Sequence, residues 1–205
     1  MRSKLSFWCG LIGIVGCVSV LAADLIGTIV VDKHNPISET ISALALGKYA
    51  WIQDVGLDLF AAALLACAIG LYSLKLGGFR WKLGTALLGL LCVNVLLIAE
   101  YNQYANRDSI GSTIHLYLVC ILGIAFALLT FLLAPGLRKV GLKWHRFTLW
   151  IAILWTVLAP FFFLIPTGWD GAYERFVALI MVTWVTGMSW LLISQRRRHT
   201  FAHHN

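Results

Sequence analysis

The polar segment 35–46 contains the residues whose types and spacing could support chemistry. Asn35 and the proline after it predict the start of a short helix, because an Asn side chain caps free N–H groups and proline suits the first helical position. From that start, Ser38, Glu39 and Ser42 fall three and four positions apart and share one face. A serine hydroxyl can act as a nucleophile, and a carboxylate as a base or a cation ligand. We therefore expect this segment to form the wall or the cover of a pocket.

Four carboxylates are expected at the same end of the neighbouring apolar runs. Asp24 lies in the outer part of the first run, and Glu100 lies at the end of the third. Asp54 and Asp58 begin the second run one helical turn apart, so they share a face. Asp58 lies among apolar residues, and an unpaired carboxylate in a membrane-spanning helix costs about 2.5–3.5 kcal/mol. We therefore expect Asp58 to have a partner or a function.

A histidine and a Glu–Arg pair stand at the beginning of two later runs. His115 opens the fourth run. A histidine in such a position commonly satisfies a local hydrogen bond, and the alternative is a base or ligand beside the carboxylates. Glu174 and Arg175 precede the sixth run. Glu174 suits the first turn of a helix, whereas Arg175 either neutralises one of the carboxylates or holds an anionic headgroup.

The composition predicts a membrane protein. Hydrophobic residues make up 60% of the 205 positions, charged residues 12%, and the mean hydropathy is +0.84. Crossing a membrane takes about 20 helical residues. We predict an all-α polytopic fold in one domain, followed by a basic tail at 195–205. Its six transmembrane helices lie near 5–31, 52–74, 83–101, 114–134, 147–165 and 176–194.

The first run has a second interpretation, a cleaved signal peptide, because Val20-Leu21-Ala22 resembles a cleavage site. We favour a membrane span, since apolar sequence continues to Val31. The glycines at 10, 13 and 16 predict a face on which another helix packs closely. In the fifth run, Pro160 predicts a kink.

The charges predict the orientation. Twelve of the 16 Lys and Arg residues lie in the N-terminus, two loops and the tail, and all nine acidic residues lie toward the other side. By the positive-inside rule we expect both termini to be cytoplasmic. The net charge of +7 then faces anionic lipid, and no nucleic acid is expected as a partner. The five cysteines lie in apolar runs without metal-ligand spacing, so we expect them to be free.

Several short motifs distributed along the whole chain resemble a known membrane family. They are Asn35-Pro36-Ile37-Ser38 with Ser42, the segment from Trp51 to Asp58, His115, and Tyr173-Glu174-Arg175. The chain resembles the six-helix family catalogued as domain of unknown function nine-nine-eight. This resemblance implies a six-helix inner-membrane protein and supplies no reaction, substrate or catalytic residue.

Three hypotheses for the function remain open. The first is an outward-facing pocket that binds or translocates a polar small molecule, a cation, a proton or a lipid headgroup. The second is an intramembrane hydrolase or lipid-modifying enzyme, with Ser38 or Ser42 as nucleophile, or with His115 and the carboxylates holding a metal. The spans contain too few histidines for a three-His metal site. The third is a non-catalytic assembly or lipid-organising protein. Under the first hypothesis, the residues expected to line the outward-facing pocket are Ser38, Glu39, Ser42, Asp58, Glu100 and His115.

Overall fold

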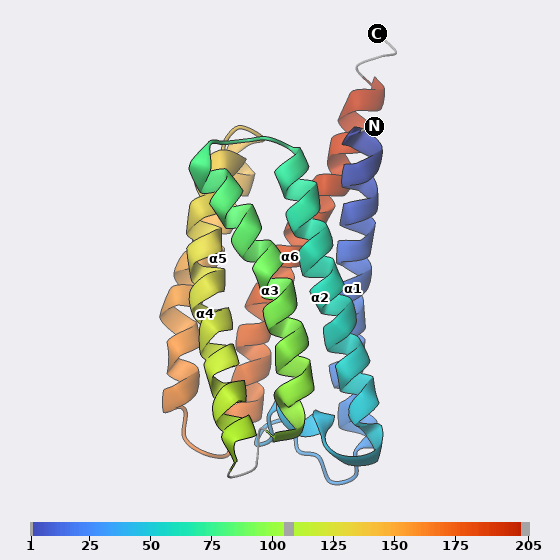
Figure 1. Cartoon of the computed structure of the whole chain (residues 1–205), viewed down its shortest axis with the longest axis vertical. Helices are drawn as coiled ribbons and strands as arrows, with labels where there is room; N and C mark the ends of the chain where they lie inside the picture. The colour runs from blue at the N-terminus through green and yellow to red at the C-terminus, as the bar shows by residue number, and fades with distance from the viewer. Residues whose placement is uncertain (1, 105–108, 202–205) are drawn as a thin grey trace.

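Six long helices form the molecule, which we describe from a computed structural model for residues 2–104 and 109–201. The side chains are described for residues 4–104 and 109–195. No strand occurs among these residues. Each helix packs against the next, and the last packs against the first two (Figure 1). The helices are α1 (Arg2–Val30), α2 (Ala50–Ser73), α3 (Phe79–Tyr101), α4 (Ile110–Leu137), α5 (Leu142–Leu158) and α6 (Asp170–Phe201). The predicted all-α fold class is confirmed.

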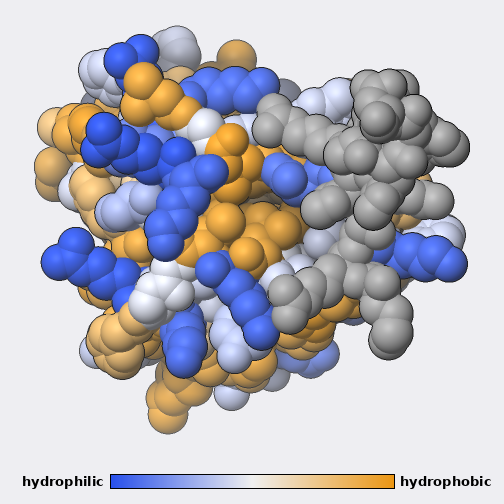
Figure 2. All heavy atoms as spheres, turned by 90° about the horizontal axis from the view of Figure 1, so that it is seen from above, coloured by the Kyte–Doolittle hydropathy of each residue, from blue (hydrophilic) through white to orange (hydrophobic). Residues whose placement is uncertain are grey.

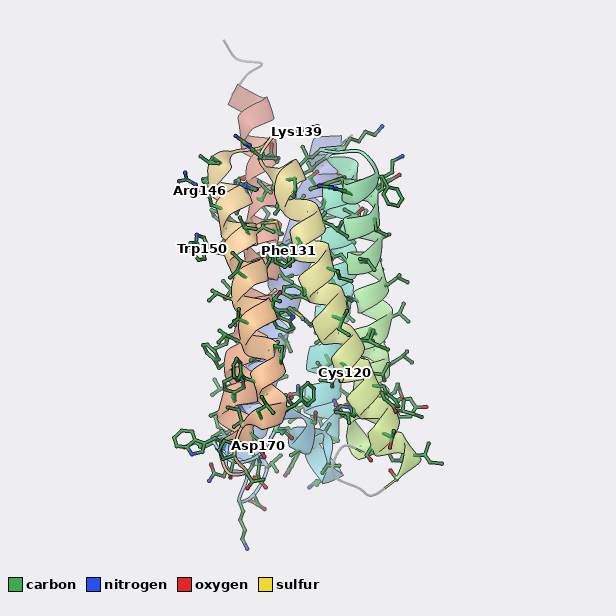
Figure 3. All side chains as sticks on the ribbon, turned by 90° about the vertical axis from the view of Figure 1, so that its left-hand side faces the viewer. Cys120, Phe131, Lys139, Arg146, Trp150 and Asp170 are labelled. Atoms are coloured by element: carbon green, nitrogen blue, oxygen red, sulfur yellow. The ribbon has the colours of Figure 1, made fainter. Side chains whose placement is uncertain are left out.

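All six helices are long and apolar enough to cross a membrane, so the chain is a polytopic membrane protein. Large apolar side chains lie on the outside of the bundle, among them Phe131 and Trp150, which are 42% and 63% exposed (Figure 3). The interior is packed by aromatic rings. Phe126 lies edge-on to Trp155 and Trp184, at centroid distances of 4.7 and 5.6 Å.

The two ends of the bundle differ in charge. The beginning of α1 and the end of α6 lie at one end, with Lys139 and Arg146 near it, and Asp170 lies at the opposite end (Figures 1 and 3). Seen from the first end, hydrophilic side chains surround an apolar centre (Figure 2). We call these the basic end and the acidic end. The predicted loop residue Asp108 and the tail residues 202–205 lie outside the described residues.

The glycines of α1 pack closely on two neighbouring helices. A Cβ at Gly10 or Gly13 would collide with Ser189 of α6, and one at Gly16 would collide with the backbone of Leu59 in α2. The prediction of a packing face is confirmed. It holds α1 against both α2 and α6.

The short helix predicted over residues 35–46 is not confirmed. The chain forms a turn at residues 36–38 and then two 3-10 helices, η1 (Ile41–Ala45) and η2 (Gly47–Tyr49). Thr40, which lies between the turn and η1, has an extended backbone with φ −65° and ψ 160°. The physical reason is competition for hydrogen bonds, because side chains of α6 bind backbone groups of this segment that an α-helix would use internally.

The fifth span changes its helix type near the predicted kink. The α-helix α5 ends at Leu158, and the chain continues as the 3-10 helix η4 (Ala159–Leu164). Pro160 has no N–H to donate to the preceding turn, which accounts for the end of the α-helix at this point. A further 3-10 turn, η3 (Asn102–Tyr104), follows α3 at the acidic end.

Candidate functional site

Arg175 is the centre of a polar network at the acidic end. Its Nε donates to Oδ2 of Asp24 at 3.1 Å, and its Nη2 lies 2.9 Å from Oδ1 of the same carboxylate. The pair is thus joined by one charge-assisted hydrogen bond and one close ion contact, because Oδ1 is buried without a hydrogen bond of ordinary geometry. Their side chains are 16% and 23% exposed. Asp24 therefore faces the bundle, and Arg175 neutralises it.

The same guanidinium holds segment 31–46. Its Nη1 donates to the carbonyls of Pro36 and Glu39, both at 2.9 Å, and to that of Gly171 at 3.2 Å. Gly171 lies so close to the segment that a Cβ would collide with the Glu39 carbonyl. The next amide along α6, that of Ala172, donates to the Ile37 carbonyl at 3.0 Å. The segment is thus docked on the first turns of α6.

His34 lies between Arg175 and Glu39, with its side chain 2% exposed. Its Nε2 is 3.2 Å from Arg175 Nη2, and its Nδ1 is 3.3 Å from Glu39 Oε2. Because a guanidinium only donates, Nε2 must accept, which places the proton on Nδ1 facing the carboxylate. Burial lowers the pKa of His34. Glu39 and Asp24 act in the opposite direction, and Arg175 adds to the lowering.

Two further carboxylates bind backbone amides of the segment. Glu39 Oε2 accepts from the Asn35 amide at 2.7 Å, and Glu174 Oε2 accepts from the Ile41 amide at 2.7 Å. The Asn35 side chain in turn accepts from the Ile37 amide at 3.0 Å. We call the six residues Asp24, His34, Asn35, Glu39, Glu174 and Arg175 the Arg175 network.

A second polar group joins the segment to α4. Ser42 of η1 and His115 of α4 are both 9% exposed, and Ser42 Oγ is 3.3 Å from His115 Nε2. The other ring nitrogen, Nδ1, is buried and lies toward the backbone of Ile98. It has no hydrogen bond of ordinary geometry among the described residues. A Ser–His pair of this kind can bind a polar group or activate the hydroxyl.

Two buried amides lie at the same end and were not among the predicted site residues. Gln53 at the start of α2 is 0% exposed, and neither Nε2 nor Oε1 has a partner among the described residues. Asn102 of η3 is 1% exposed, and its Oδ1 is likewise unpartnered. Because η1 packs against α2 and η3, and η3 packs against α4, we group them with the Ser–His pair. We call Ser42, Gln53, Asn102 and His115 the inner polar group.

The remaining predicted site residues have no hydrogen bond to this group among the described residues. Ser38 is half-buried in the turn. Asp54 is half-buried, whereas Asp58 and Glu100 are exposed. Asp58 and Glu100 each interact electrostatically with Asp54. Within the described part of the chain, no hydrogen bond or ion pair connects these carboxylates to the inner polar group. The described hydrogen bonds and ion pairs therefore form the Arg175 network and the Ser42–His115 pair, and whether all the predicted residues share one pocket stays a prediction.

An open hollow of about 530 Å³ adjoins this region. Ile114 and Tyr101 line it, and they are the chain neighbours of His115 and Asn102. Its other lining residues are Glu100, Gln103, Tyr104, Ser109, Ile110 and Gly111. Within residues 2–104 and 109–201, no group of three or more His, Cys, Asp or Glu side chains is placed to hold a metal ion.

Comparison with protein-family models gave one match, described as "Protein of unknown function (DUF998)", over residues 14–191. The matched range includes all the members of the Arg175 network and of the inner polar group. Comparison with curated proteins and with solved structures gave no match.

Proposed function

This chain belongs to the DUF998 family of proteins of unknown function, and we propose that it binds a polar ligand at the inner polar group. The proposed ligand is an uncharged polar molecule or the headgroup of a lipid. The proposed location is the plasma membrane, with the basic end cytoplasmic and the acidic end outside. The positive-inside rule supports this orientation, because most Lys and Arg residues belong to the basic end.

The observation that carries the proposal is the set of buried, unpartnered polar atoms. Within the inner polar group they are the two side-chain atoms of Gln53 and Oδ1 of Asn102. A buried polar atom without a hydrogen bond costs about 1–3 kcal/mol, and folded proteins retain few of them. Three such atoms, from two elements that both pack against η1, favour a site that is completed by a bound polar group.

The chemistry of the inner polar group indicates the class of ligand. Amide, hydroxyl and imidazole groups offer both donors and acceptors without a formal charge, which suits hydroxyl and amide groups of a ligand. Asp54, Asp58 and Glu100 at the same end create a negative potential that disfavours anions. We therefore propose a ligand without net negative charge, rich in hydroxyl or amide groups.

Native mass spectrometry of the gently purified protein tests the proposal. We expect the wild type to retain a polar molecule or one lipid class, and Gln53→Leu to lose it. Gln195→Leu is the matched control, because Gln195 is an amide near the end of α6, at the basic end of the bundle. Equal retention by both variants, or no retained ligand on the wild type, would contradict the proposal.

A second candidate function is hydrolysis or acyl transfer, favoured by the 3.3 Å contact between Ser42 Oγ and His115 Nε2. In this mechanism His115 takes the hydroxyl proton as Ser42 attacks an ester carbonyl, and returns it to the alcohol that leaves as the ester C–O bond breaks. Water or an acceptor alcohol, deprotonated by His115, then takes the acyl group from Ser42. A fluorophosphonate probe tests it directly. We expect labelling of the wild type and its loss in both Ser42→Ala and His115→Ala. Absence of label on the wild type would exclude this candidate while leaving the binding function untouched.

A further inference from the structure

Segment 31–46 contains both Ser42 of the inner polar group and His34 of the Arg175 network. We propose that His34 is a pH-sensitive latch, which holds this segment closed over the inner polar group while neutral and releases it when protonated. The inference rests on the proposed function, since it concerns access to that same site. It would let acidification outside the membrane open the site.

The closed geometry requires a neutral ring. Arg175 Nη2 donates to His34 Nε2 across 3.2 Å, so that nitrogen must present its lone pair. Protonation replaces the lone pair with an N–H and sets two cations at this distance. The contact therefore changes from a hydrogen bond to a repulsion.

The charged groups around His34 come from every element packed against it. Glu39 belongs to the same segment, Asp24 to α1, and Glu174 and Arg175 to α6. Glu39 and Asp24 favour a protonated ring. However, Asp24 is already paired with Arg175, and Glu39 also binds the Asn35 amide. Burial is the largest influence, and the pKa of His34 is lowered from its ordinary 6.5 in the closed form.

The direction of the pH effect follows from the difference between the pKa of His34 in the closed segment and its pKa in the open segment. In the open segment the ring is solvated, so its pKa returns to about 6.5. Closure therefore has its full stability above that value and loses it progressively as the pH falls toward the lower pKa of the closed form. Acid favours the open segment.

Loss of one contact affects several others, because Arg175 holds the segment at more than one point. The guanidinium that faces His34 also binds the carbonyls of Pro36 and Glu39. A guanidinium displaced by a charged ring would weaken both of these hydrogen bonds. Release of His34 is therefore expected to loosen the whole turn rather than a single side chain.

Hydrogen exchange of the full-length protein in nanodiscs at pH 7.5 and 5.0, corrected for intrinsic exchange rates, tests the latch. In peptides covering residues 31–46 we expect the wild type to lose protection at pH 5.0. The protection factor is expected to fall by up to about tenfold for each unit by which the pKa of His34 is lower in the closed form than in the open form. His34→Gln keeps a donor and an acceptor without titrating, so its protection should not depend on pH.

A permanently charged variant provides the second measurement. His34→Lys should exchange at pH 7.5 as fast as the wild type does at pH 5.0, while peptides from α2 and α4 keep their protection. The proposal that His34 is the latch is wrong if exchange protection of residues 31–46 keeps its wild-type pH dependence in His34→Gln. It is also wrong if Glu174→Gln alone removes that dependence. Gln53→Leu should lose ligand yet keep that dependence, which separates failure of the latch from failure of the binding function.

Discussion

Arg175 and Asp24 lie 151 positions apart and face each other through two contacts, Nε to Oδ2 at 3.1 Å and Nη2 to Oδ1 at 2.9 Å. The pair connects the last helix to the first. The remaining donor atom, Nη1, binds two carbonyls of segment 31–46. One side chain thus fixes the relative position of α1, α6 and the segment between α1 and α2.

Replacement of this guanidinium should loosen the acidic end. A lysine ammonium cannot make the two-point contact and also reach the carbonyls of Pro36 and Glu39. We expect Arg175→Lys to lower the free energy of unfolding by about 1–3 kcal/mol, the range for lost hydrogen bonds to charged groups. Thermal unfolding in detergent measures it. Arg146→Lys, at an exposed position near the basic end, should have no effect, and equal effects would argue against the clamp.

Gly171 provides a test of close docking. Gly171→Ala places a Cβ against the Glu39 carbonyl, so segment 31–46 must move away from α6. We expect faster proteolysis within this segment and a lower melting temperature. Gly123→Ala is the matched control, because nothing lies within 4 Å of a Cβ at that position of α4. Its melting temperature should be unchanged or slightly higher, since alanine favours a helix by up to about 1 kcal/mol.

Much of the fold could be predicted from the sequence, because the length of an apolar run directly reports a membrane-spanning helix. The conformation of segment 35–46 could not be predicted, and the helix expected there was wrong for a physical reason. The carbonyls of Pro36 and Glu39 are bound by Arg175, which lies 139 and 136 positions away. Local propensities do not register a competitor so distant in the sequence.

The candidate site could be predicted in part. Asp24 and Arg175 stood out because charges near a membrane-spanning helix need partners, and each neutralises the other. Gln53 and Asn102 did not stand out, since amides are ordinary at helix ends. Only packing of η1, η3 and α2 reveals that both are buried. Which polar residues meet depends on helix packing, which the spacing within one helix does not determine.

Removal of the buried amide at position 53 should separate stability from function. Gln53→Leu replaces unpartnered polar atoms with an apolar side chain of similar size. We expect the ligand-free protein to become about 1–3 kcal/mol more stable while binding is lost. Chemical unfolding of ligand-stripped protein measures this, with Gln195→Leu as the matched control. A destabilised Gln53→Leu would indicate that the amide is satisfied within the protein.

The proposed orientation can be checked by labelling single cysteines. Thr167, in the turn before α6, and Arg80, at the start of α3, are exposed at opposite ends of the bundle. We expect Thr167→Cys to react with a membrane-impermeant maleimide on intact cells, and Arg80→Cys to react only after lysis. The native cysteines give low background, since four are buried and Cys120 is half-buried. The reverse pattern would invert the proposed topology.

The contact between α1 and α6 also constrains how the protein is made. Helices enter the membrane in the order of synthesis, so segment 31–46 is delivered long before its anchor exists. Arg175 emerges 136 residues after Glu39, and until then Asp24 has no guanidinium to neutralise it. Insertion of the sixth helix therefore completes the acidic end, and a chain truncated before Arg175 would keep five spans but have an unanchored segment over the inner polar group.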